Sequence, residues 1–88
     1  MTQPLAPMID QRVARRIREQ RLRIGMTQQQ LARRIGVAFQ QAHKYEHGLS
    51  RISAGRLYDI ATALKAPVEY FFGEEAGDRG FTNGGGDA

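Results

Sequence analysis

The 88-residue sequence contains no cysteine, no tryptophan and only three prolines. Without cysteine, neither a disulfide framework nor a thiolate metal site can stabilise the chain, so helix packing has to do so. No run of consecutive apolar residues is longer than three, which excludes a membrane span and a secretory signal segment within this sequence. The length leaves room for one small domain and for no large catalytic architecture. We expect a cytoplasmic protein.

Charge and glycine divide the chain into three parts. Residues 9 to 72 carry twelve Lys and Arg against five Asp and Glu, a net charge of +7, whereas residues 73 to 88 have a net charge of −3. Six of the ten glycines also lie in residues 73 to 88. We predict a flexible leader over residues 1 to 8, a basic domain over 9 to 72 and a disordered, acidic, Gly-rich tail over 73 to 88. A basic domain favours binding to a polyanionic partner such as nucleic acid.

Apolar spacing and capping residues predict five helices, because no segment alternates with the period of a strand. Ile9, Val13 and Ile17 share one face of a first helix, with Asp10 as a possible N-cap and Gly25 as the stop signal. This helix also holds a crowd of arginines that surrounds it. We interpret most of them as a solvated surface rather than a phosphate clamp.

Two short helices follow, joined by a link of about two residues. Thr27 and Gln30 form a capping box at the start of the second helix, and Gly36 ends it. The third helix is predicted over residues 39 to 48 and closes at Gly48. Its apolar side is predicted to consist of Ala42, Tyr45 and Leu49.

The fourth helix begins at its N-cap Ser53, and Pro67 opens a short fifth helix over residues 67 to 72. Short helices are marginal alone in water, so we predict a compact all-α, five-helix domain held by a shared core. The predicted core is Val13, Ile17, Ile24, Met26, Leu31, Ala32, Ile35, Val37, Tyr45, Ile52, Leu57, Ile60, Leu64, Val68 and Phe71.

The second and third helices have the layout of a DNA-reading helix-turn-helix. The run TQQQLARRIGVAFQQAHKYEHGLSRIS, followed by GRLYDIATAL and PVEYFF, resembles the lambda-repressor-like helix-turn-helix family, the Cro or XRE type of prokaryotic and phage transcription regulators. The resemblance is carried by the T-Q opening, Ala32, Gly36 and the Y-E-x-G ending, and it covers residues 9 to 72. It implies a DNA-binding domain with the third helix as the base reader.

The resemblance also implies roles for individual residues. The base-reading positions are Phe39, Gln40, Gln41, His43 and Lys44. The positions near the DNA backbone are Gln28, Arg34, His47, Ser50 and Arg51. Arg21 and Glu46 match a basic and an acidic position that pair across the first and third helices. In two departures from the family pattern, Ala38 replaces the usual Ser or Thr cap of the third helix, and Ala42 replaces a larger aliphatic residue.

The same residues allow other interpretations. His43 and His47 are spaced as a metal pair would be, but no third ligand completes a zinc site, so we expect no metal and no cofactor. The polar face of the third helix, read without the family pattern, would be an ordinary solvated surface. Tyr70, Phe71 and Phe72 are core residues, a dimer seam or both, with Tyr70 and Phe72 as the candidate dimer contacts.

The sequence therefore predicts a non-enzymatic, sequence-specific regulator of transcription, a repressor that binds double-stranded DNA as a homodimer at a near-palindromic operator. One alternative is an antitoxin that autoregulates its operon and binds a toxin through its tail. The other is a protein-protein interaction module built on the same scaffold. No acid pair or nucleophile has an arrangement suited to catalysis.

Overall fold

A computed structural model describes residues 3 to 73, which form five helices and no strand. The helices are α1 (Ala6–Arg23), α2 (Gln28–Ile35), α3 (Phe39–Glu46), α4 (Ala54–Leu64) and α5 (Val68–Phe72). The all-α, five-helix prediction is confirmed. The predicted tail lies outside the described residues, apart from Gly73.

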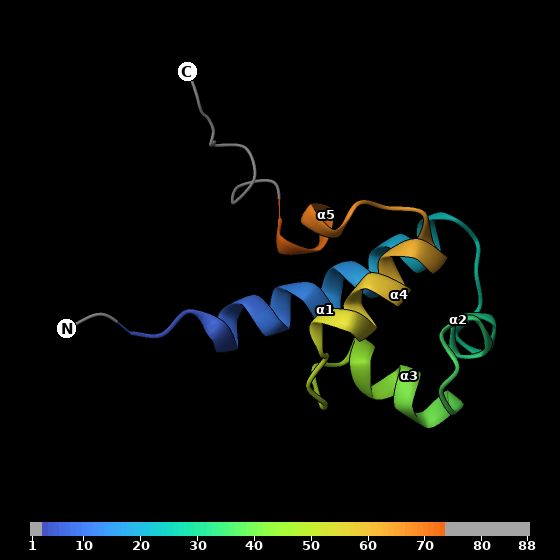
Figure 1. Cartoon of the computed structure of the whole chain (residues 1–88), viewed down its shortest axis with the longest axis horizontal. Coiled ribbons are helices and arrows are strands. Elements are labelled where there is room, and N and C mark those ends of the chain that lie inside the picture. Colours follow the sequence, from blue (N-terminus) through green and yellow to red (C-terminus); the bar gives the residue numbers. More distant parts are fainter. Residues whose placement is uncertain (1–2, 74–88) are drawn as a thin grey trace, which may run out of the picture.

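The longest helix, α1, is the spine of the fold (Figure 1). It packs against α3, α4 and α5, while α2 packs against α3 and α4. In the view of Figure 1, α5 lies on one side of α1 and α3 on the other. Within residues 3 to 73, no helix has both the length and the apolar character that crossing a bilayer requires.

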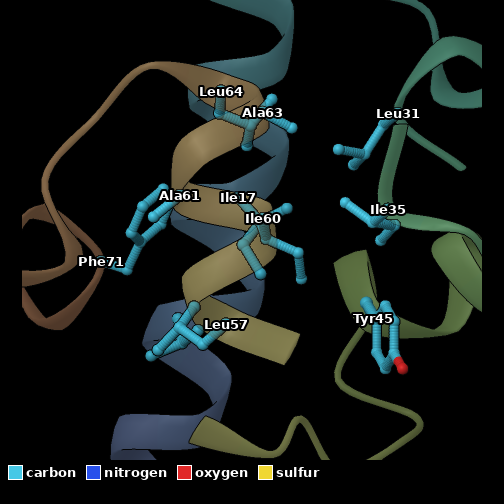
Figure 2. Close-up of a cluster of buried hydrophobic side chains, with 11 residues drawn as sticks. Ile17, Leu31, Ile35, Tyr45, Leu57, Ile60, Ala61, Ala63, Leu64 and Phe71 are labelled. Carbon is cyan, nitrogen blue, oxygen red and sulfur yellow. The ribbon is translucent and has the colours of Figure 1, made fainter. Parts of the chain in front are cut away.

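All five helices contribute side chains to the core. Figure 2 shows Leu31 and Ile35 pointing from α2 toward Ile60, with Phe71 approaching Ala61 from the opposite side. Phe71, Ile60 and Leu31 are each 0% exposed, as expected for the large apolar side chains of a close-packed interior. Ten predicted core residues are confirmed as buried: Val13, Ile17, Leu31, Ala32, Ile35, Tyr45, Leu57, Ile60, Leu64 and Phe71. Four others are partly buried against this cluster: Met26, Val37, Ile52 and Val68.

Two predicted apolar positions are wrong. Ile24 is 38% exposed because it is the C-cap residue of α1, where the chain leaves the helical path. Leu49 is 69% exposed because Gly48, with a φ of +69°, turns the chain away after α3. Glycine suits this place because a positive φ disfavours other residues.

Three predicted helix boundaries also need correction. α1 begins at Ala6, within the predicted flexible leader, and its N-cap is Leu5 rather than Asp10. Pro7 lies in its first turn, where the fixed φ of proline and its missing N–H are tolerated. α3 ends at Glu46, two residues early, and Pro67 is the N-cap of α5 rather than part of its first turn.

Candidate nucleic-acid interface

Hydrogen bonds fix α2 at its N-terminus and at the turn that leads from its C-terminus to α3. The Thr27 hydroxyl accepts a hydrogen bond from the Gln30 N–H (3.0 Å), and the Gln30 side chain accepts one from the Thr27 N–H (2.8 Å). The predicted capping box is therefore confirmed. At the other end Gly36 adopts the left-handed conformation (φ +75°), as predicted, and the Val37 N–H donates to the Ala32 carbonyl (3.0 Å). Three residues, 36 to 38, then connect α2 to α3.

One buried carboxylate joins α1, α2 and α3. The side chain of Glu46 is 0% exposed and accepts two bonds from Arg21, at 2.6 Å from Nε and 3.0 Å from Nη2. The Gln28 amide adds a third bond to this carboxylate, at 3.1 Å. Arg21 also donates from Nη1 to the Met26 carbonyl (2.9 Å). These bonds hold α3 against the other two helices, which is the structural role that the family resemblance implies for Arg21 and Glu46.

The opposite face of α3 is open and carries no acid. Phe39 is 45% exposed, and Gln40, His43 and Lys44 are exposed beside it. The spacing of Gln40, His43, Lys44 and His47 places them on one side of the helix. The imidazole rings of His43 and His47 stack with centroids 4.1 Å apart, and no group of three potential metal-ligating side chains occurs among the described residues. The surface therefore presents hydrogen-bonding groups and positive charge to solvent.

Gln41 is set apart from this face, although the sequence grouped it with the base-reading residues. Its side chain is partly buried, and its Nε2 donates to the hydroxyl of Ser50 at 2.9 Å. Ser50 lies in the loop between α3 and α4. One residue of the predicted base-reading group is thus bonded to one residue of the predicted backbone-contacting group.

The remaining predicted backbone contacts have different surroundings. Arg51 is exposed in the loop after α3, next to Ser50. Arg34 is exposed, but it lines a shallow pocket with Tyr58 and Thr62, which places it toward α4. The side-chain amide of Gln28 is turned to Glu46, so the group that Gln28 offers at the start of α2 is its backbone N–H. His47 is exposed, and its Nδ1 bonds the His43 carbonyl at 2.9 Å.

A helix-turn-helix family model matches residues 17 to 71. The chain belongs to the helix-turn-helix family of the Cro/C1 type. It is similar to an uncharacterised transcriptional regulator from Rhodospirillum rubrum, named for its place in an ATPase CF(0) region. The two are 55% identical over 71 residues, which cover 80% of this chain and 66% of that protein. An uncharacterised helix-turn-helix-type regulator from Sinorhizobium medicae is 44% identical over 77 residues, 88% of this chain and 55% of its own length.

A third relative, an uncharacterised helix-turn-helix-type transcriptional regulator from Rickettsia conorii, is 47% identical over 64 residues, 73% of this chain and 51% of its own length. The chain thus spans between about half and about two thirds of the length of these three relatives. The family resemblance predicted from the sequence is confirmed.

Behind the helix-turn-helix unit, the three aromatic residues of α5 have three different surroundings. Phe71 is fully buried. Tyr70 is covered by two arginines of α1, with Arg16 at 4.6 Å and Arg23 at 5.6 Å from its ring centroid. Phe72 is half-buried and lines a groove of about 470 Å³ between α1, α5 and the loop after α3. Of the two predicted dimer contacts, Phe72 borders an open apolar groove and Tyr70 does not.

Sequence analysis missed two residues that support the helix-turn-helix unit. Gln20 is 8% exposed and donates to the Leu64 carbonyl at 2.9 Å, tying α1 to the end of α4. Gln20 follows Val13 and Ile17 at helical spacing, which places it on the same buried face of α1 and was the sequence signal of its burial. Arg56 donates from α4 to the carbonyl of Ile35 at the end of α2, where a cation favours the helix C-terminus. No local sequence pattern indicates that contact, since it depends on how α4 crosses α2.

Proposed function

We propose that this chain is a sequence-specific, double-stranded DNA-binding regulator of transcription that inserts α3 into the major groove. The observation that carries the proposal is the open face of α3. It holds Gln40 and Lys44 and has no acid, because the acid of this helix, Glu46, is buried against Arg21. Membership of the helix-turn-helix family supports the same function, as does the naming of its relatives as transcriptional regulators.

The exposed side chains suit the edges of base pairs. A glutamine such as Gln40 can hold adenine N6 and N7 with two hydrogen bonds, and a lysine such as Lys44 can donate to guanine O6 and N7. Phe39 can pack on a thymine methyl group, with His43 beside it. Each well-formed bidentate pair contributes about 1 to 3 kcal/mol of discrimination, so two or three such contacts give a strong preference for one short sequence.

The flanking groups suit phosphates. The backbone N–H of Gln28 lies at the positive end of α2, and Arg51, Ser50 and His47 follow α3 on the chain. Contacts of this kind fix the register of a protein on the duplex, whereas base contacts select the sequence. Arg34 belongs to the same group only if its side chain turns from α4 toward the DNA.

We propose further that the protein acts as a repressor and as a two-fold dimer. The groove lined by Phe72 and Leu49 leaves apolar surface exposed beside α1, which supports a contact between two copies there. A two-fold dimer reads a near-palindrome whose half-sites lie about 34 to 36 Å apart, one turn of B-DNA. A regulator bound to such a site within a promoter would block access of the polymerase.

A binding-site selection from random duplexes tests this function. The expected result is a recovered near-palindrome, with half-sites separated by one helical turn. The matched control is the double variant Gln40→Ala/Lys44→Ala, which keeps the Arg21–Glu46 ion pair and the loop after α3. It should recover a consensus that lacks the base pairs read by Gln40 and Lys44. Retention of every duplex with equal affinity would contradict base reading, and no binding to any duplex at low salt would favour a protein-protein interaction module.

A further inference from the structure

Neighbouring glutamines at the start of α3 have different environments. Gln40 is exposed, whereas Gln41 is partly buried and donates from Nε2 to the hydroxyl of Ser50 at 2.9 Å. This bond connects the first turn of α3 to the loop beyond its other end. The loop, residues 49 to 52, carries Ser50 and Arg51, two of the groups expected to meet the DNA backbone.

The loop depends on Gln41 for its position. The Leu49 N–H bonds the Lys44 carbonyl at 3.0 Å as the chain leaves α3. Beyond that point, the Gln41 bond is the only hydrogen bond within residues 3 to 73 that holds residues 50 to 52. The other anchor is Ile52, which is partly buried against the core. Arg51 is exposed between these two anchors, so the path of its backbone depends on the bond between Gln41 and Ser50 as well as on Ile52.

The direction of the bond also matters chemically. A serine hydroxyl is one donor with two acceptor lone pairs. Because Gln41 donates to the oxygen of Ser50, the O–H of Ser50 remains available to donate to an anionic oxygen. A hydroxyl that accepts one bond is polarised and becomes a stronger donor for the next. Gln41 therefore prepares Ser50 to bind a phosphate.

We propose that Gln41 is a positioning residue, which holds Ser50 and Arg51 against the DNA backbone rather than reading a base. This inference rests on the proposed function, and it separates Gln41 from Gln40 within that function. Gln41 then contributes to affinity on every sequence, while Gln40 contributes to the preference for one sequence.

The experiment measures dissociation constants by fluorescence anisotropy on two duplexes, the selected site and a scrambled duplex of equal length and composition, at one fixed ionic strength. The variants are Gln41→Ala, Ser50→Ala and their combination, with Gln40→Ala as the matched control on the adjacent position. We expect Gln41→Ala to weaken binding to both duplexes by the same factor, about 2- to 10-fold, as for loss of one hydrogen bond. We expect Gln40→Ala to weaken binding to the selected duplex alone.

Two further readouts separate positioning from a general structural role. The double variant Gln41→Ala/Ser50→Ala should bind DNA as well as whichever single variant has the lower affinity, because both changes remove the same hydrogen bond. Ser50→Thr keeps the hydroxyl and should bind as the wild type does. A loss confined to the selected duplex in Gln41→Ala, or additive losses in the double variant, would overturn the inference.

One measurement on the free protein keeps this inference distinct from the proposed function. In Gln41→Ala, the backbone order parameters of residues 49 to 52 from nitrogen-15 relaxation should fall from values near those of rigid backbone, about 0.85, toward those of flexible segments, below about 0.6. Unchanged order parameters would overturn the positioning role. If the wild type binds no duplex, the proposed function fails, whereas a fall in these order parameters still supports Gln41 as the residue that holds the loop.

Discussion

Arg21 and Glu46 form a bidentate ion pair. The Arg21 Nε lies 2.6 Å from one carboxylate oxygen and the Nη2 lies 3.0 Å from the other, and the Glu46 side chain is fully buried. The pair sits behind α3, so the acid of that helix is neutralised inside the protein. The exposed face of α3 is left polar and basic as a result. The same bonds fix the direction in which that face points, because Arg21 belongs to the spine helix α1.

Removing one partner of this pair should be far more damaging than removing both. Arg21→Leu leaves a buried carboxylate without its cation, and we expect it to lower the free energy of unfolding by about 3 to 5 kcal/mol. The double variant Arg21→Leu/Glu46→Leu leaves no unpaired buried charge and should recover most of that loss. Urea unfolding followed by circular dichroism measures both values, and purely additive losses would contradict the account of the pair.

The N-terminus of α3 offers a route to higher stability. Ala38 occupies the N-cap position and makes no side-chain cap, as the sequence indicated. Ala38→Ser should add the missing hydrogen bond and raise stability by about 1 kcal/mol, which corresponds to roughly 4 to 8 °C in melting temperature for a domain of this size. Thr27→Ala removes the observed cap of α2 and should shift the melting temperature downward by a similar amount. Differential scanning calorimetry would refute the capping argument if neither variant moved.

The sequence predicts the local features of the fold better than the points at which its helices begin and end. Caps and left-handed turns are local, so Thr27, Ser53 and Gly36 could be assigned from neighbouring residues alone. The first turn of α1 was missed because Pro4 and Pro7 are typical of a loose leader, although proline is also tolerated in the first turn of a helix. Ile24 was wrongly placed in the core because helical spacing continues in the sequence beyond the residue at which the helix itself ends.

Arg51 should contribute to binding through charge alone. Replacing it with alanine removes one phosphate contact, so the slope of log affinity against log salt concentration should fall by about one unit, with little change in base preference. Lys65→Asn is the matched control. It removes one positive charge at the far end of α4, about 16 Å along that helix, and asparagine tolerates the left-handed conformation that Lys65 adopts (φ +60°). An equal change of slope in both variants would show that net charge, rather than a contact of Arg51, accounts for the effect.

Phe72 is the aromatic residue of α5 that we expect to contribute to dimerisation. Phe72→Ala removes an aromatic side chain from the edge of the groove, and we expect at least about a tenfold rise in the dimer dissociation constant. Tyr58→Ala removes an aromatic side chain that is 66% exposed on α4 and should leave the constant unchanged. Sedimentation equilibrium gives these constants, with circular dichroism to verify that both variants are folded. A Phe72→Ala variant that dimerises as the wild type does would remove this face from the dimer contact.

Only part of the candidate site could be predicted from the sequence. Gln40, His43 and Lys44 were placed on the outer face because helical spacing fixes which residues share a side. The bond between Gln41 and Ser50 could not be predicted, since it depends on how the loop folds back after the left-handed Gly48. The turn of Arg34 toward α4 likewise follows from the crossing of α2 and α4, which no local pattern encodes.

The central claim is that the open side of α3 selects a DNA sequence, and the base preference of Gln40→Ala tests it most directly. Affinities are measured for the wild type and for this variant on the selected duplex and on its single-base-pair substitutions. We predict that the variant loses its preference at one base pair in each half-site, by a factor corresponding to about 1 to 3 kcal/mol, while its affinity for scrambled DNA is kept. An equal loss on every duplex, or no loss on any, would contradict the account.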